Sequence, residues 1–248
     1  TVDAGGEVVA AELAALEATG GGIAIVDAVL DKHLESIGYG VEGLPLITGG
    51  SGVAIGLPEN YRRAGLLADR GAADALPPVP GSAAVLAGSC STATLGQIAR
   101  FESEHPSFAV DALCLARGED VVAQALDWAA ARIGDGPVLI YASQPAEKVR
   151  EIQKELGRAE AGALIEEAMA AIARGLVASG TRRLVVAGGE TSGAVVSALG
   201  IEGLQIGPQI DPGVPATVSL GADPLALALK SGNFGGPDFF AKALACMP

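Results

Sequence analysis

The sequence predicts an α/β fold in which a mostly parallel sheet is flanked by helices, with Gly-rich loops at the carboxyl-terminal ends of the strands. Short apolar runs alternate with longer segments whose apolar residues recur every three or four positions, as is typical of strand–helix–strand units. Four of the apolar runs stop directly in a glycine and serine cluster. Half of the residues are hydrophobic but only 4% are aromatic, which favours close packing of helices on a sheet.

The first part of the chain should already alternate in this way, with helices over 7–18 and 31–37 and strands over 23–26 and 44–48. Pro58 is expected to break the helix that follows the second strand, because a proline inside a helix removes a backbone donor. Residues 71–82 contain three prolines and form a linker-like stretch. The sequence leaves open whether this stretch is a domain boundary or a long surface loop.

After residue 82 the alternation becomes regular. Strands are expected over 83–87, 107–110, 137–142, 183–187, 203–206, 214–220 and 225–230. Helices are expected over 92–101, 119–133 and 191–199, with two more on either side of Gly157 and a last one that Pro237 opens. Met169 belongs to the apolar stripe of the helix after Gly157, which predicts a core position for its side chain.

The composition argues against several classes of function. The net charge of −13 disfavours nucleic acid as a partner, because phosphate backbones are held by clustered Lys and Arg. No apolar stretch reaches the ~18–20 residues that span a bilayer, so no membrane partner is expected. Three cysteines without C-x-x-C spacing and two histidines favour a reducing cytoplasm and predict no metal site. Cys90 is expected to be buried, and the start at Thr1 without methionine predicts an upstream segment.

The loop Gly188–Gly193 follows the clearest strand and begins a helix. A helix N-terminus offers N–H groups and the positive end of the helix dipole, so we expect an anion there, with the hydroxyls of Thr191 and Ser192 as further donors. The loop is not a Walker A motif, because Ala194–Val195 occupies the place of the required Lys-Ser/Thr pair. Glu190 can hold Mg²⁺ through water or cap the helix, and the cap is favoured.

Three other loops carry weaker signals. Gly88–Ser91 has the same strand-to-helix setting, although Ser91 can serve simply as the N-cap. Lys230 directly precedes Ser231–Gly236 and either neutralises a phosphate or extends to solvent. Gly50–Gly56 resembles a dinucleotide fingerprint with one residue too many, and the acidic residue expected ~20 positions later has no good counterpart.

Taken together, the loops resemble the four-carbon acid sugar kinase family, in the segments LPLITGGSGVAIGLP (44–58), LAGSCSTAT (86–94), VVAGGETSG (185–193), IGPQIDPGVP (206–215) and LKSGNFGGPDFFA (229–241). The resemblance is to the carboxyl-terminal, nucleotide-binding half of two-domain enzymes that phosphorylate threonate, erythronate or 3-oxo-tetronate with ATP. It implies that the residues contacting ATP are Ser89, Gly189, Glu190, Thr191, Ser192 and Gly232. The aspartate-rich motif of the family's amino-terminal, acid-binding domain does not occur in this sequence.

We therefore expect residues 1–248 to form the nucleotide-binding domain of a sugar-acid kinase that uses ATP and Mg²⁺ and receives its acid through a missing amino-terminal domain. The resemblance places the catalytic base and the acid-binding groups in that amino-terminal domain, so the isolated chain is expected to be inactive; the catalytic residues stay unknown and no metal ligand is named. The alternatives are an NAD(P)-dependent oxidoreductase and a non-catalytic nucleotide-binding module. The acid, its stereochemistry and the formation of a homodimer stay open.

Overall fold

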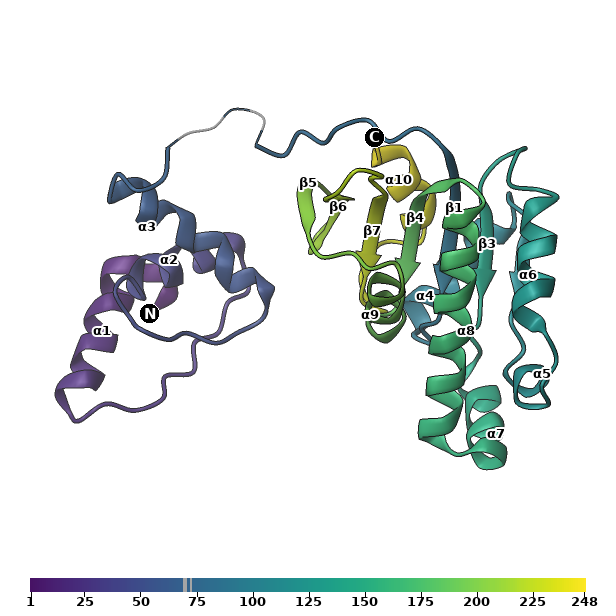
Figure 1. Ribbon diagram of the computed structural model, residues 1–248. Helices are drawn as coiled ribbons and strands as arrows, with labels where there is room; N and C mark the ends of the chain where they lie inside the picture. The colour runs from purple at the N-terminus through teal and green to yellow at the C-terminus, as the bar shows by residue number, and fades with distance from the viewer. Residues whose placement is uncertain (69–70, 72) are drawn as a thin grey trace. The chain divides into compact units, whose positions relative to one another are not determined.

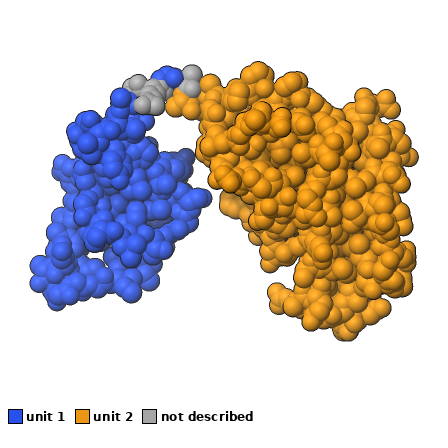
Figure 2. All heavy atoms as spheres, in the orientation of Figure 1, with its two compact units in different colours: residues 1–72 blue, residues 73–248 orange. Residues whose placement is uncertain are grey.

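The computed structural model describes residues 1–68, 71 and 73–248. Contacts divide the chain into two compact units, residues 1–72 and 73–248 (Figures 1 and 2). The boundary falls at the start of the proline-rich stretch, for which the sequence left a domain boundary and a surface loop as alternatives. None of the described helices combines the length and the hydrophobicity that a membrane-spanning helix needs.

The larger unit is built on a sheet whose strand order is β2-β3-β1-β4-β7-β6-β5, as far as the described residues go. The strands are β1 (Ser82–Ala87), β2 (Ser107–Ala109), β3 (Val138–Tyr141), β4 (Thr181–Ala187), β5 (Leu204–Asp211), β6 (Val214–Ser219) and β7 (Ala226–Lys230). The neighbouring strands β2, β3, β1, β4 and β7 pair in parallel. Strand β6 pairs antiparallel with both β7 and β5. The predicted mostly parallel α/β sheet is therefore confirmed.

Helices cover both faces of this sheet (Figure 1). They are α4 (Thr92–Glu102), α5 (Ala112–Ala116), α6 (Val121–Ala130), α7 (Ala146–Leu156), α8 (Arg158–Ala178), α9 (Gly189–Ala198) and α10 (Phe239–Cys246). A hydrophobic core lies on each face of the sheet, one beneath α4 and α10 and a second beneath α6, α8 and α9. Alternate residues of β1 point to opposite faces, so Val85 packs in the first core and Leu86 in the second. Met169 is fully buried in the second core, as the helical stripe predicted.

The smaller unit differs from the sequence prediction. Its helices are α1 (Gly6–Ala18), α2 (Asp31–Gly40) and α3 (Leu57–Arg63), together with short 3₁₀ turns η1 (Val2–Ala4) and η2 (Ser51–Gly56). The strands predicted over 23–26 and 44–48 are absent, because the described part of this unit offers no strand for them to pair with. Pro58 lies in the first turn of α3, where its missing N–H is harmless, and does not break a helix.

Candidate functional site

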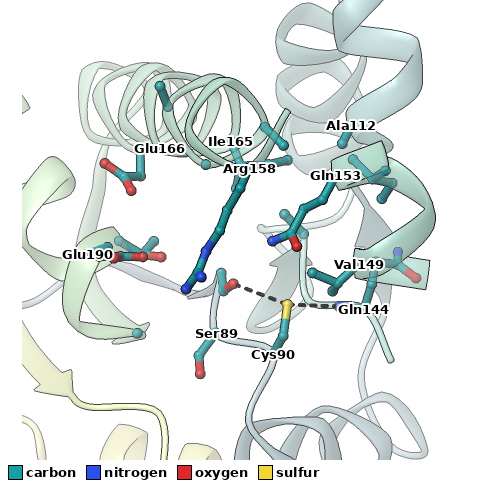
Figure 3. A pocket seen from close by; sticks show the side chains of 18 of the residues that line it. Ser89, Cys90, Ala112, Gln144, Val149, Gln153, Arg158, Ile165, Glu166 and Glu190 are labelled. Atoms are coloured by element: carbon teal, nitrogen blue, oxygen red, sulfur yellow. Dashed lines mark hydrogen bonds between the residues drawn. The ribbon is translucent and has the colours of Figure 1, made fainter. Parts of the chain in front are cut away.

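The strand order places a crevice beside β1. The chain runs from β1 to β2 and β3 on one side and then crosses to β4 on the other side. The loops that leave the carboxyl ends of β1 and β4 therefore diverge, and such a switch point is where open α/β sheets bind ligands. A cleft of about 860 Å³ lies at this point (Figure 3). Of the four glycine clusters, those after β1, β4 and β7 follow strands of this sheet, whereas Gly49–Gly52 follows none.

The loops after β1 and β4 are held against each other by backbone hydrogen bonds. The N–H groups of Gly88 and Ser89 donate to the carbonyl of Ala187, at 3.0 and 3.2 Å. A side chain on Gly88 would put its Cβ 2.1 Å from Thr191 Oγ1, so only glycine permits this approach. Gly188 has a φ of 129°, a conformation that other residues rarely adopt. The two glycines thus bring two loops from distant parts of the sequence together.

The first turn of α9 presents free donors to the cleft. Its N-cap is Gly188, and no side chain caps the helix within the described residues. The first N–H groups of a helix have no intrahelical acceptor, and the helix dipole adds positive potential there. Gly189, Glu190 and Thr191 line the cleft at this end. This arrangement can hold an anion.

The structure separates the six residues predicted to contact ATP into two groups. Ser89, Gly189, Glu190 and Thr191 line the cleft, whereas Ser192 and Gly232 do not. The hydroxyl of Ser192 is buried without a hydrogen-bond partner in the described chain. Gly232 packs against Ser89, and a Cβ on Gly232 would lie 2.2 Å from Ser89 Oγ. This glycine therefore allows the loop after β7 (residues 231–236, the β7 loop) to approach the loop after β1 (residues 88–91).

Lys230 is buried and does not extend to solvent, so that alternative of the sequence analysis is wrong. Its ammonium donates to Thr94 Oγ1 and to the carbonyl of Gly232, both at 2.9 Å. Burial lowers the pKa of Lys230 to about 8. Ser91 caps α4 by accepting from the N–H of Thr94, as predicted, and its hydroxyl also donates to Gly232 O at 2.6 Å. These contacts anchor the β7 loop on the N-terminus of α4.

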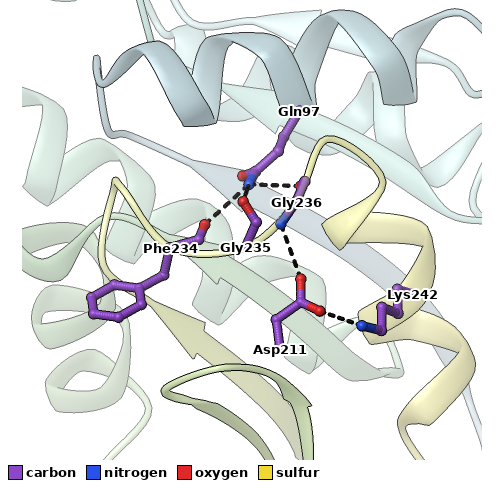
Figure 4. Close-up of polar contacts among 6 residues, drawn as sticks. All are labelled: Gln97, Asp211, Phe234, Gly235, Gly236 and Lys242. Carbon is purple, nitrogen blue, oxygen red and sulfur yellow. Dashed lines mark hydrogen bonds and ion pairs between the residues drawn. The ribbon is translucent and has the colours of Figure 1, made fainter. Parts of the chain in front are cut away.

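The rest of the β7 loop is anchored by Gln97 and Asp211 (Figure 4). The buried amide of Gln97 lies 3.0 Å from the carbonyl oxygens of Phe234, Gly235 and Gly236. The Asp211 carboxylate accepts from the N–H of Gly236 at 3.0 Å and pairs with Lys242 of α10. The hydrogen bond from Lys242 lowers the pKa of Asp211, and the N–H of Gly236 adds to this effect. The glycine-rich loop is therefore held in one conformation.

Sequence reasoning missed the contribution of α7 and α8. Arg158 begins α8, and its guanidinium reaches into the middle of the cleft towards Ser89 and Glu190 (Figure 3). It forms no ion pair within the described chain. Val149 and Ile152 of α7 add apolar side chains to the lining of the cleft, and Gln144 and Gln153 add amides. The helical spacing of Val149 and Ile152 was visible in the sequence, but nothing local told whether that stripe faced the core or a ligand.

Two further expectations for side chains in the cleft are wrong. Cys90 is exposed, not buried: it lines the cleft, and its sulfur accepts from the N–H of Gln144 at 3.4 Å. Glu190 makes no capping hydrogen bond in the described chain, although it lies in the first turn of α9. The carboxylates of Glu190 and Glu166 lie at the same end of the cleft (Figure 3). Among the described residues, no group of three His, Cys, Asp or Glu forms a metal cluster.

The dinucleotide fingerprint over 50–56 does not have the setting that its chemistry needs. A fingerprint glycine loop joins a strand to a helix, so that the helix N-terminus faces the pyrophosphate. In the structure, Ser51–Gly56 is a 3₁₀ turn of the smaller unit, and no strand precedes it in the described chain. This finding removes the motif on which the oxidoreductase alternative depended.

A mostly parallel sheet with glycine loops and an uncapped helix at its switch point is typical of an α/β nucleotide-binding domain. The family model described as "Nucleotide-binding C-terminal domain" matches residues 84–240. The chain belongs to the four-carbon acid sugar kinase family, of which this domain is the carboxyl-terminal part.

The curated relatives and solved structures that it matches are longer. A 3-oxo-tetronate kinase of Cupriavidus necator is 58% identical over 242 residues, which cover 97% of this chain and 55% of that protein. A 3-oxo-tetronate kinase of Pseudomonas fluorescens is 58% identical over 241 residues, with the same coverage. A crystal structure from Salmonella typhimurium LT2 matches with a TM-score of 0.83 and 37% identity, over 100% of this chain and 58% of that one. The chain thus spans little more than half the length of these relatives.

Proposed function

We propose that residues 73–248 bind ATP in the cleft between the loops after β1 and β4. The observation that carries this proposal is the uncapped N-terminus of α9 at the switch point of the sheet, beside glycines that a larger residue could not replace. Backbone N–H groups at such a point bind phosphate without a lysine of the Walker type. The acidic chain therefore needs only local donors to hold one nucleotide.

The cleft has a polar end at the N-terminus of α9, which suits the phosphates of a nucleotide, and an apolar end at α7, which suits its base. The polyphosphate would lie on the N–H groups of Gly189 and its neighbours, with the hydroxyl of Ser89 as a further donor. Arg158 would neutralise phosphate charge from the opposite wall, since its guanidinium has no carboxylate partner in the described chain. The base would stack against Val149 and Ile152, which give the cleft an apolar surface.

The cleft also fits Mg²⁺. Magnesium in phosphoryl-transfer sites is held by one or two carboxylates together with the phosphates, and not by a protein cage. Glu190 and Glu166 supply carboxylates at the phosphate end (Figure 3). When bound, the ion would neutralise charge on the transferred phosphoryl group.

The reaction that we propose is transfer of the γ-phosphoryl group to a hydroxyl of 3-oxo-tetronate, the substrate in the names of the relatives. This chain matches 55% of the Cupriavidus necator protein, so we place the acid-binding groups and the catalytic base in the remaining part. On this proposal, residues 1–248 are the carboxyl-terminal portion of a two-domain kinase. The protein supplies mainly positioning and charge neutralisation in such transfers.

Calorimetry with ATP, ADP and NADH tests the nucleotide part of the proposal. ATP and ADP should bind the chain, Mg²⁺ should strengthen the binding, and NADH should not bind. Failure of ATP and ADP to bind at millimolar concentration would contradict it, whether or not NADH binds. Binding of NADH in place of ATP would restore the oxidoreductase alternative.

A further inference from the structure

Two extended segments of the smaller unit expose an unusual amount of apolar surface. Residues 22–29 and 44–49 are neither helix nor paired strand. Ile23 and Ile25 are 94% and 90% exposed, and Leu46 is 82% exposed. Isolated exposed apolar residues are ordinary, but a contiguous group marks a surface that another element covers.

Most of the backbone of these segments also has no hydrogen-bond partner in the described chain. Within the described chain, no backbone hydrogen bond involves residues 22–28 or 45–49. Ile23 to Val26 is rich in β-branched residues, which favour strands. An extended apolar segment with free N–H and C=O groups is an open strand edge, ready to pair with another strand. The second segment continues from Pro45, which lacks an N–H but is tolerated near the start of a strand, into the apolar and β-branched run Leu46–Thr48. Both segments therefore have a composition that suits strands, but the described chain provides no sheet for them.

The helices of this unit lack a sheet as well. The side chains of Val9 and Leu13 on α1 and Ile37 on α2 line an apolar cleft of about 650 Å³, and the two extended segments line the same cleft. Among the described residues of this unit, Val9 and Ile37 are its buried apolar side chains. Two such residues cannot stabilise a domain of this length, because folding must offset ~1–2 kcal/mol of backbone entropy per residue.

The relatives contain further chain that can fill this space. The match to the Cupriavidus necator kinase covers 97% of this chain, so it includes nearly all of residues 1–72, and 45% (100 − 55) of that protein lies outside the match. The nucleotide-binding family model begins only at residue 84. The smaller unit is thus part of the relatives' fold but not of their nucleotide-binding domain.

We propose that residues 1–72 complete a second α/β domain by adding the strands 22–29 and 44–49 to a sheet supplied by the amino-terminal region of the longer protein. The helix α2 would be the crossover between two parallel strands, and α1 would cover one face of the sheet. The occupant of the apolar cleft is then the missing sheet. This inference depends on the length of the relatives and not on nucleotide binding.

A fusion protein tests the proposal. The amino-terminal region of the Cupriavidus necator relative, up to the start of the match, is joined in register to Thr1 of this chain. Hydrogen exchange is then compared between the fusion and the isolated chain. Amides of residues 23–28 and 46–48 should exchange at least ~100-fold more slowly in the fusion, while those of β1 and β4 should be protected in both proteins. ADP binding by both proteins is measured separately. The exchange result can therefore be interpreted even if neither protein binds ADP.

A pair of substitutions supplies the control. Ile25→Lys in the fusion should restore fast exchange in both segments, whereas Ile206→Lys, at an exposed isoleucine of β5, should leave them protected. Equal exchange of the segments in the fusion and the isolated chain, with β1 and β4 protected, would overturn the proposal. Protection in the isolated chain that accompanies a dimeric mass in light scattering would also overturn it, because a second copy would then be the occupant.

Discussion

The ammonium group of Lys230 lies 2.9 Å from the hydroxyl of Thr94, at a position that is only 1% exposed. Lys230 ends β7, and Thr94 lies in the first turn of α4, so this contact joins the last parallel strand to the helix after β1. No carboxylate of the described chain pairs with this lysine. Desolvation of the charge is therefore poorly compensated, and the pKa of Lys230 falls to about 8.

This buried lysine predicts how stability depends on pH. Its pKa is lower in the folded chain than the ordinary 10.5, so the unfolded chain binds more protons between pH 8 and 10.5. The free energy of unfolding therefore gains a term that rises with pH in this window. Lys230→Met removes this term. Urea unfolding should therefore show that the free energy of unfolding of wild type, relative to that of the variant, is larger at pH 10 than at pH 7.5. Lys154→Met, at an exposed position, is the control, and parallel pH profiles for wild type and Lys230→Met would contradict the prediction.

Gly189→Val should weaken ADP binding without unfolding the chain. A Cβ on Gly189 meets no atom within 4 Å, so the fold tolerates it, but the side chain would project where phosphate must approach the backbone. We expect a loss of at least ~10-fold in affinity, about 1.4 kcal/mol. Gly193→Val is the matched control, since Gly193 lies in the same helix with equally open surroundings and does not line the cleft. If both variants bind ADP like wild type in calorimetry, phosphate does not lie on α9.

Arg158→Ala should lower the affinity for ATP more than the affinity for adenosine. A guanidinium that contacts phosphate adds a charge-assisted hydrogen bond of ~1.5–3 kcal/mol, which adenosine cannot form. Arg174→Ala removes an exposed arginine from the same helix and should change neither affinity. Equal losses for ATP and adenosine would place Arg158 at the base and not at the phosphates.

Asp211→Asn should destabilise the β7 loop by ~1–2 kcal/mol, because the charged partner of Lys242 is lost and the hydrogen bond from Gly236 is weakened. The pKa of Asp211 is lowered on folding, so its contribution is present above the ordinary value of 3.8 and disappears as pH falls through the folded value. The difference in the free energy of unfolding between wild type and variant, measured with urea, should accordingly reach its whole value at pH 7 and become smaller below pH 3.8. Asp223→Asn, at an exposed carboxylate, should show neither effect.

The isolated chain should bind ATP but phosphorylate no four-carbon acid. Without a positioned acceptor the reaction loses the proximity contribution, ~7–11 kcal/mol at most, and without a base the hydroxyl is not activated. Assays with D-threonate, D-erythronate and 3-oxo-tetronate should give no turnover above background. Robust turnover by residues 1–248 alone would show that the acceptor site lies within this chain.

Much of the larger unit was predictable from local pattern. The strands after residue 82 were recognisable as apolar runs, Met169 as a core residue and Ser91 as a helix cap. The failures lie where a side chain or strand depends on a distant partner. Residues 23–26 and 44–48 have the composition of strands, yet composition cannot supply the neighbouring strand that a sheet requires. Cys90 resembled a buried residue because its sequence neighbourhood does not reveal the cleft.

The sequence by itself determined the α/β class, the strand and helix alternation and the glycine loops, because periodicity and backbone freedom are properties of short segments. The tertiary structure alone decided which loops meet. Ser89 and Gly189 come together because β4 pairs with β1, and no local signal encodes that strand order. The same applies to Arg158 in the cleft and to the burial of Lys230: each depends on elements far away in the chain, whose packing sets the solvent access and charge around the side chain.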